Sequence, residues 1–227
     1  RVAELEANVQ ADGVATGTGI AHTRWATHGA PAVHNAHPHF SAGPNVDAMA
    51  TGFGALPGEG GAPTAARVGL VHNGIIENHD ELRAELRQRG YHFASQTDTE
   101  VIAHLVHSLY DGDLLEAVQR ALPRLRGAYA IAVFCRDEPQ RVVGARQGSP
   151  LVLGVGAAGK GTQENFLASD AMALAGVTDQ IVYLEEGDVV DLQLGKVWIT
   201  APDAQHRYLP VQRPVRTVHA HSGAAEL

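Results

Sequence analysis

Three short stretches of the 227-residue chain carry the side-chain types that a pocket for a free amino acid needs. Arg24 can hold a carboxylate through two parallel hydrogen bonds, and the neighbouring Trp25 can cover a small ligand. Asn73 and Gly74 offer a side-chain amide and a backbone N–H that can donate to one developing oxyanion. Asp98 offers a carboxylate that can meet an ammonium group. Together these groups describe an amino-acid pocket.

Each of these residues also has a simpler interpretation. Arg24 could stack on Trp25 for packing alone, Asn73-Gly74 is a strong signal for a hairpin turn, and Asp98 could cap a helix. The residues after Gly74 lead quickly into a capped helix, which weakens the hairpin interpretation. Thr97 and Glu100 already form a capping-box pattern, so Asp98 would lie in the first helical turn with its carboxylate free.

The elements that must position these residues come in blocks. Strand patterns occupy 17–25, 67–76, 128–135, 141–146, 150–155, 165–169 and 180–200. Three helix starts lie between the second and third of these: Asn78 with Glu81, Thr97 with Glu100, and Asp113 with Glu116, the first helix ending at Gly90. Helices grouped in the middle and strands elsewhere predict an α+β domain with a largely antiparallel sheet.

Two segments fall outside this pattern. Residues 43–67 are rich in Gly, Pro and Ala and nearly uncharged, which predicts a surface insertion. At the start of the chain, Val2, Leu5 and Val9 share one helical face, which indicates the end of an amphipathic helix and a chain that begins inside an element.

Composition narrows the choice of partners. A formal net charge of −8 and only 17 Lys and Arg residues argue against nucleic-acid binding. No apolar run approaches the roughly 18 residues that a membrane span requires, and the single cysteine, Cys135, agrees with a reducing compartment. We therefore interpret the chain as cytoplasmic, with small molecules as partners and neither a membrane nor a nucleic acid among them.

Two further motifs suggest ligands but fail on context. The run GVGAAG at 154–159, followed by Lys160, matches a dinucleotide fingerprint and nearly a P-loop, yet only a few residues separate it from the next strand, so a Gly-rich hairpin is expected. His34, His37 and His39, or His219 and His221, could suggest a metal site. They lack cysteine and helical i,i+4 partners, so we expect a hydrogen-bonded turn and neither metal nor cofactor.

Several stretches between His22 and about Asp191 together carry a family resemblance. They include TRWATHGAP, NAHPH, VHNGIIENHDELR, SQTDTEVIAHL, LRGAYAIAVF and ARQGSPLVLGVG, in this order. They resemble the glutaminase domain of class II glutamine amidotransferases, and NGIIENH with TDTEVIAHL points to the glutamine–fructose-6-phosphate aminotransferase (isomerizing) branch. The resemblance implies an N-terminal-nucleophile (Ntn) hydrolase fold, a four-layer αββα sandwich, incomplete here at its N-terminus. It also implies that glutamine is hydrolysed and that ammonia passes to a sugar-phosphate domain, which converts fructose 6-phosphate to glucosamine 6-phosphate.

The resemblance also implies roles for individual residues. Asn73 and Gly74 would form the oxyanion hole, Arg24 would bind the α-carboxylate of glutamine and Asp98 its α-amino group. The remaining candidates surround the substrate: Trp25, Thr27 and His28 in a closing loop, and His37 supporting the surroundings of that loop.

The chain departs from the family in its nucleophile. These enzymes attack with an N-terminal cysteine whose own α-amine is the general base, whereas this sequence begins with Arg1, and Cys135 lies in the apolar run AIAVFC, where a buried structural thiol is expected. We therefore expect an inactive fragment lacking the cysteine, with a non-catalytic glutamine-binding module as the alternative. Residues 1–210 would form the glutaminase domain, including the long insertion 43–67, and 211–227 a tail or linker toward absent sugar-isomerase domains. The complete enzymes of the family are typically homodimers.

Overall fold

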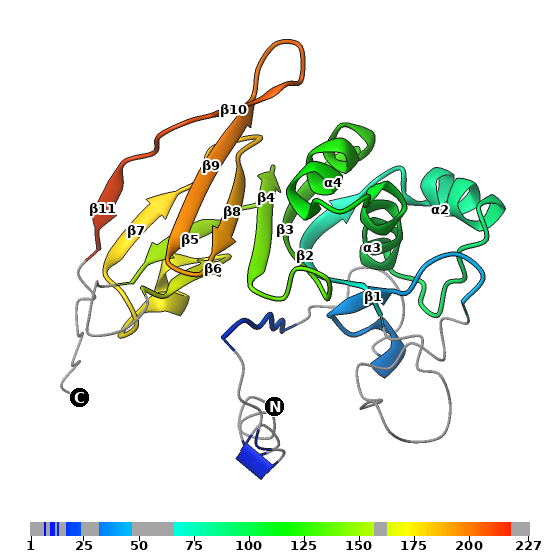
Figure 1. Ribbon diagram of the computed structural model, residues 1–227, viewed down its shortest axis with the longest axis horizontal. Helices are drawn as coiled ribbons and strands as arrows, with labels where there is room; N and C mark the ends of the chain where they lie inside the picture. Colours follow the sequence, from blue (N-terminus) through cyan, green and yellow to red (C-terminus); the bar gives the residue numbers. More distant parts are fainter. Residues whose placement is uncertain are drawn as a thin grey trace, which may run out of the picture.

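Two antiparallel sheets packed against each other form the centre of the molecule, and helices cover one face of the larger sheet (Figure 1). The computed structural model describes residues 17–23, 32–46, 66–156 and 163–218, with the single positions 7, 10, 11 and 13. None of the helices in this part of the chain is long and apolar enough to cross a membrane.

The larger sheet has seven strands in the order β1-β2-β3-β4-β8-β9-β10, and the smaller has four in the order β11-β7-β5-β6. All neighbouring strands are antiparallel. The strands of the larger sheet are β1 (His39–Ser41), β2 (Val68–Ile76), β3 (Gly127–Cys135), β4 (Arg141–Gln147), β8 (Val189–Gln193), β9 (Lys196–Pro202) and β10 (Tyr208–Pro210). Those of the smaller sheet are β11 (Val215–Thr217), β7 (Gln180–Tyr183), β5 (Val152–Val155) and β6 (Asn165–Ala168).

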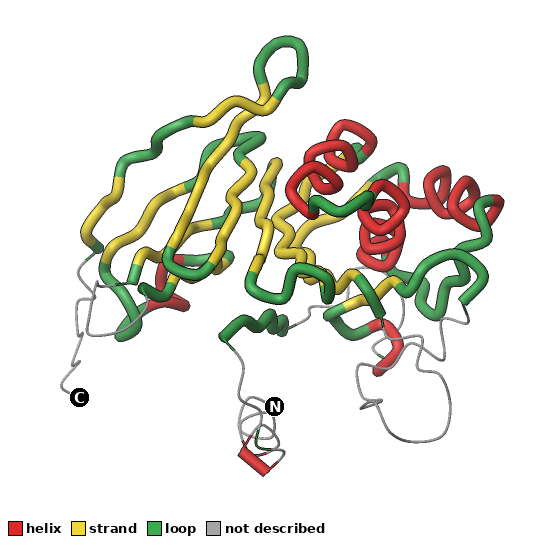
Figure 2. Tube along the Cα trace, in the orientation of Figure 1, coloured by secondary structure: helices red, strands yellow, loops and turns green. Residues whose placement is uncertain are grey.

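The α-helices gather on one side of the larger sheet (Figure 2). They are α2 (His79–Gln88), α3 (Asp98–Leu109) and α4 (Leu114–Ala121), and short 3-10 turns occur at η1 (Val33–Asn35), η3 (Leu122–Arg124) and η4 (Ala171–Leu174). This arrangement of helices and antiparallel strands confirms the predicted α+β class.

Alternation along the strands creates two cores on opposite faces of the larger sheet. Toward the helices, Leu70 and Ile131 of the sheet pack in one cluster with Ile102 and Leu105 of α3. On the other face, the described strands of the two sheets share a second cluster that includes Ala130, Leu153, Val182, Val190 and Leu192. The molecule is therefore layered as helices, larger sheet and smaller sheet.

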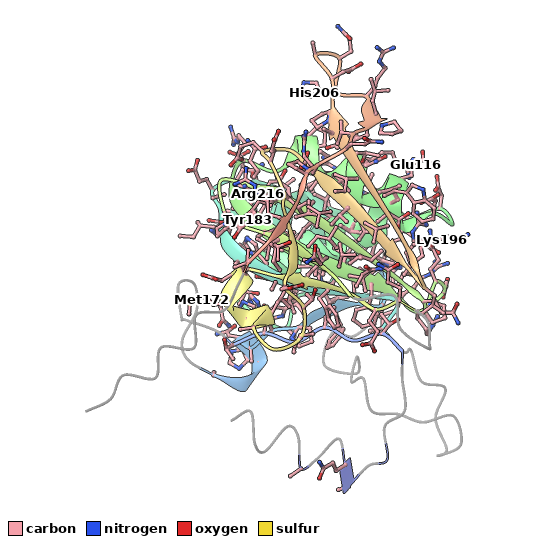
Figure 3. All side chains as sticks on the ribbon, turned by 90° about the vertical axis from the view of Figure 1, so that its left-hand side faces the viewer. Glu116, Met172, Tyr183, Lys196, His206 and Arg216 are labelled. Atoms are coloured by element: carbon pink, nitrogen blue, oxygen red, sulfur yellow. The ribbon has the colours of Figure 1, made fainter. Side chains whose placement is uncertain are left out.

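The outer face of the smaller sheet is only lightly covered in the described part of the chain. Leu174 of η4 packs there on Val152 and Ile181. Tyr183 and Arg216, from the paired strands β7 and β11, lie on this side, with the guanidinium carbon 5.9 Å from the ring centroid (Figure 3). The α, β and β layers of the predicted sandwich are thus described, and η4 is the element seen on the fourth side.

Two of the three predicted helix caps form. Thr97 accepts a hydrogen bond from Glu100 N at 3.3 Å, and Asp113 accepts one from Glu116 N at 3.1 Å. The predicted Asn78 cap is wrong, since its side chain makes no capping bond at the start of α2. Asn78 instead donates to Arg124 O and accepts from Arg126 N, both at 2.9 Å, because these backbone groups have no ladder partner where η3 leads into β3.

The strand pattern also differs from expectation at the ends. Residues 17–23, the described part of the first expected strand, do not form a strand with any other described residues. Past Pro210, β11 pairs with β7 over Val215–Thr217, whereas the division of the chain at that residue stays a prediction.

The two Gly-rich segments are described in part. Residues 47–65 of the expected insertion lie outside the described residues, but its first part is tied down by Asn45 N, which donates to Gly90 O at 2.7 Å. The GVGAAG run begins in β5, and β5 pairs antiparallel with β6, so it belongs to a hairpin connection, as predicted. Residues 157–162 of that connection are not described.

Candidate functional site

Asn73 and Gly74 lie inside β2 rather than in a turn. Asn73 is opposite Ala130 and Gly74 opposite Tyr129 on β3, which excludes the hairpin-turn interpretation. Gly74 has φ +133°, and a Cβ built on it would lie 2.1 Å from the carbonyl oxygen of Ala128. Backbone conformation and neighbour therefore both require glycine at position 74.

Asn73 lines a cavity of about 560 Å³ between the two sheets. The lining includes Val71 and Ala130 from the larger sheet and Leu151 and Leu167 from the region of the smaller sheet. Because the side chains of a strand alternate between faces, Asn73 faces the cavity, whereas His72 is buried on the side of α3 and bonds to Thr99.

Asp98 joins the start of α3 to the end of β2. It is the first residue of α3 and only 3% exposed. Its Oδ2 accepts a hydrogen bond from Ile76 N at 2.9 Å and lies 3.8 Å from His72 Nδ1, while Oδ1 has no hydrogen-bond partner among the described residues. A carboxylate at a helix N-terminus is stabilised by the helix dipole. The role predicted for Asp98 toward an ammonium group stays a prediction, and Asp98 is not among the residues that line the cavity.

The loop before α3 is held by two buried charged side chains. Arg83 donates to Ser95 O at 3.0 Å and to Thr97 O at 2.7 Å. Glu100 accepts hydrogen bonds from Ala94 N at 2.8 Å, Ser95 N at 2.7 Å and Ser95 Oγ at 2.6 Å. Burial alone would raise the pKa of Glu100, but the groups that face it, His104, Ser95 and Ala94 N, together lower it to about 2. In the expected capping box, the Glu100 side chain would accept a hydrogen bond from Thr97 N. It accepts instead from Ser95 N and Ala94 N, which lie earlier in the loop.

His34 and the two histidines of the NAHPH stretch hold this same loop. His37 bonds to Thr99 Oγ1 at 3.0 Å, His39 to Thr97 Oγ1 at 2.9 Å, and His34 to Gln96 Oε1 at 3.3 Å. Each ring thus has its own partner near the start of α3. In the part of the chain that the structure describes, no group of three or more His, Cys, Asp or Glu side chains is placed to hold a metal ion. His219 and His221 lie outside it.

One site residue was missed by sequence reasoning. His22 Nε2 contacts Asn73 Oδ1, and the His22 ring stacks on His37 with 4.3 Å between centroids. The two partners are 51 positions apart in the sequence, so spacing could not reveal the contact. The available signal was the place of His22 two residues before Arg24.

The glutamine amidotransferase domain family matches residues 58–175, which is more than half of the chain. The chain belongs to this family. It is 61% identical over 227 residues to the glutamine–fructose-6-phosphate aminotransferase (isomerizing) of Bordetella pertussis, covering 100% of this chain and 33% of that protein. It is 47% identical over 226 residues to the enzyme of the same name from Pseudomonas putida, covering 99% and 31%. The chain thus spans about a third of the length of the curated relatives it matches.

Among solved structures, the chain is similar to the glutamine phosphoribosylpyrophosphate amidotransferase of B. subtilis complexed with ADP and GMP. The identity is 25% and the TM-score 0.49, over 58% of this chain and 28% of that one. Family membership and the two antiparallel sheets with their helix layer agree with the predicted fold class, the Ntn-type sandwich of class II amidotransferases.

Part of the predicted site of this glutamine amidotransferase domain is not described. Arg24, Trp25, Thr27 and His28 lie outside the described residues, so their roles stay predictions. Of the remaining candidates, Asn73 and Gly74 belong to β2, and the structure links Asp98 to the same strand through Ile76 N and His37 through His72 N.

Cys135 is not placed for catalysis in this amidotransferase domain. It ends β3, is fully buried and belongs to the core between the sheet and the helices. Burial raises the pKa of its thiol, which keeps the sulfur protonated. The expectation of a buried structural thiol is therefore confirmed.

Proposed function

We propose that this chain is the glutamine-hydrolysing domain of a glutamine–fructose-6-phosphate aminotransferase. The relatives that it matches over its whole length carry that name. The observation that carries the proposal is the hydrogen bond from Ile76 N to Asp98 Oδ2 at 2.9 Å, because it fixes a buried carboxylate two residues beyond the Asn73-Gly74 pair. This bond supports the proposal because it ties the anion assigned to the α-amino group to the strand that carries the donors assigned to the side-chain carbonyl.

In the proposed reaction, a nucleophile attacks the side-chain carbonyl carbon of glutamine and the carbonyl oxygen gains negative charge. The Asn73 amide and the Gly74 N–H donate to that oxygen. The proton that the nucleophile gives up is transferred to the amide nitrogen, which leaves as ammonia when the tetrahedral intermediate collapses, and water then hydrolyses the acyl group to release glutamate. Asp98 binds the α-amino group, Arg24 the α-carboxylate, and Trp25, Thr27 and His28 close over the substrate. This chain's residues account for binding and charge stabilisation, because its only cysteine is the buried Cys135.

The finer parts of the proposal concern the whole protein. Ammonia would be delivered to a sugar-phosphate domain and used to make glucosamine 6-phosphate from fructose 6-phosphate. We also propose a homodimer in the cytoplasm. The support is that the named relatives are bacterial aminotransferases of about three times this length.

The test is glutamate release from glutamine by the protein expressed from its complete gene. Asn73→Ala removes an oxyanion donor and should lower kcat roughly 100-fold with little change in KM. Asp98→Asn keeps an acceptor for Ile76 N but removes the charge, so KM for glutamine should rise at least about tenfold. Asp113→Asn, which keeps an acceptor for the α4 cap, is the matched control and should leave both constants unchanged.

The outcomes separate the candidate functions. Glutamine binding with no release of glutamate by the wild type would favour the non-catalytic binding module. If the wild type neither binds nor hydrolyses glutamine, the proposed function is wrong.

A further inference from the structure

The contact between His22 and Asn73 fixes which end of the Asn73 amide faces the cavity. Both residues line that cavity, and His22 Nε2 lies against Asn73 Oδ1. An amide oxygen can only accept, so Nε2 must carry the proton and donate it. In this assignment Nδ1 of His22 carries a lone pair and no proton. This nitrogen is buried and has no hydrogen-bond partner in the described part of the chain. The opposite tautomer would bury an unpaired N–H there, which is the more costly of the two.

The NH₂ group at the other end of the Asn73 amide can donate a hydrogen bond to a ligand. With Oδ1 held by His22, the NH₂ group points away from the imidazole. Nδ2 has no hydrogen-bond partner among the described residues. If the amide turned over by about 180°, it would present its oxygen to the developing oxyanion, and the partial negative charge of that oxygen would repel the oxyanion. The orientation of Asn73 therefore decides whether it stabilises or opposes the reaction.

The His22 ring is itself supported by a network whose proton positions follow from its backbone members. His72 N donates to His37 Nδ1 at 3.5 Å, so His37 carries its proton on Nε2 and donates to Thr99 Oγ1 at 3.0 Å. The Thr99 hydroxyl then donates to His72 Nδ1 at 3.2 Å, and His72 Nε2 donates to Ala128 O at 3.5 Å.

His22 stacks on His37, with the rings inclined by 34°. The support for His22 therefore reaches back to Thr99, the residue after Asp98.

We propose that His22 is a positioning residue that holds Asn73 with its NH₂ group toward the oxyanion. The proposal rests on the proposed glutaminase function and adds a residue to it. His22 acts through Asn73, so its effect should vanish when Asn73 has no amide to orient.

A double-mutant cycle on glutamine hydrolysis by the protein expressed from its complete gene tests this. His22→Leu should lower kcat about 10- to 100-fold with KM changed less than about threefold, because an oxyanion donor is misplaced and ground-state binding is not. His22→Gln restores an N–H donor of similar reach and should recover most of the loss. In an Asn73→Ala background, His22→Leu should cost less than about twofold. The exposed His206, which lies between β9 and β10 and does not line the cavity, is changed to Asn as the control and should leave kcat unchanged.

Every outcome bears on the assignment. Additive effects of the two substitutions, or a rise in KM at unchanged kcat, would overturn it while leaving the glutaminase function in place. A wild type without glutaminase activity would overturn the proposed function itself, and the positioning role with it. Melting curves accompany each variant, and if His22→Leu does not fold, His22→Asn, which is polar but too short to reach Asn73, replaces it with the same expectations.

Discussion

Glycine at position 74 is required by the neighbouring strand, independently of any ligand. Its φ of +133° is rarely adopted by other residues, and the carbonyl oxygen of Ala128 occupies the place of a Cβ. Gly112, between α3 and α4, has nearly the same φ of +120° but no heavy atom within 4 Å of its missing Cβ. Substitution at Gly112 therefore tests the backbone conformation alone, whereas substitution at Gly74 also tests the steric clash of a Cβ with the Ala128 carbonyl.

Substituting each glycine by alanine measures that difference. Gly112→Ala should lower the free energy of unfolding by about 1 kcal/mol, the cost of the backbone conformation. Gly74→Ala should cost about 3 kcal/mol or more, because β2 and β3 must also separate, and it should abolish glutamine hydrolysis. Urea unfolding of both variants is the measurement. Equal losses would mean that the Ala128 carbonyl moves aside at little cost.

Single residues also show what the sequence could predict about the site. Asn73, Gly74 and Asp98 were proposed as site residues because the sequence around them argues against the alternatives, a hairpin turn and a helix cap. His22 was not, because an imidazole two residues before an arginine is compatible with many environments. Its role depends on a contact across 51 positions, which local patterns do not encode.

The start of α3 is the element on which the site depends. Arg83 of α2 donates to two buried carbonyl groups of the preceding loop, and its guanidinium carbon lies 4.5 Å from the centroid of the Phe93 ring. Arg87, one turn further along α2, lies 5.6 Å from the same ring but is exposed. The position of Asp98 thus depends on Arg83 and not on its neighbour.

Substitution by leucine should reveal this dependence. Arg83→Leu leaves the carbonyls of Ser95 and Thr97 without their charged donor, and should lower the free energy of unfolding by about 3 kcal/mol. It should also raise KM for glutamine, because Asp98 loses its support. Arg87→Leu should change stability by no more than about 0.5 kcal/mol. The same loss in both variants would show that only contact with Phe93 matters.

Features of the helices and strands were predicted correctly where they depend on residues close in sequence, and missed where they depend on residues far apart. The Thr97 and Asp113 caps form because donor and acceptor are three residues apart. The Asn78 cap fails because tertiary partners near Arg124 compete for its side chain. The three-residue strands β1, β10 and β11 exist only through their neighbours in the sheets, so no local pattern predicts them.

The acid stability of the whole molecule should decline in two steps. Burial, with Arg67 and His104 nearby, lowers the pKa of His107 from 6.5 to about 4. As the pH falls from 6.5 to 4 the unfolded chain binds a proton that the folded chain refuses, so the folded state is destabilised. Glu100, whose folded pKa is lowered from 4.5 to about 2, stabilises the fold above pH 4.5, and this contribution is lost as the pH falls toward 2.

Two substitutions should remove the steps separately. His107→Gln keeps a polar partner for the Tyr91 hydroxyl, 3.2 Å away, and should abolish the decline between pH 6.5 and 4, on the order of 3 kcal/mol. Glu100→Gln should be less stable at neutral pH and should lose the second decline. Urea unfolding at pH 7, 5 and 3 compares them with the wild type. A His107→Gln profile parallel to the wild type from pH 7 to 5 would contradict the assignment.

All nine residues of β2 pair with β3, and each face of the larger sheet is covered by its own hydrophobic core. Asn73 and Gly74 therefore belong to a segment that cannot open by itself, unlike a pair carried on a surface loop. Backbone amide protons of β2 that are hydrogen-bonded to β3 can exchange with solvent only when the sheet as a whole comes apart. The strand that carries the donors we assign to the oxyanion should therefore not unfold locally while the rest of the domain stays folded. On heating, the pair should be lost all at once, in the same event that unfolds the domain.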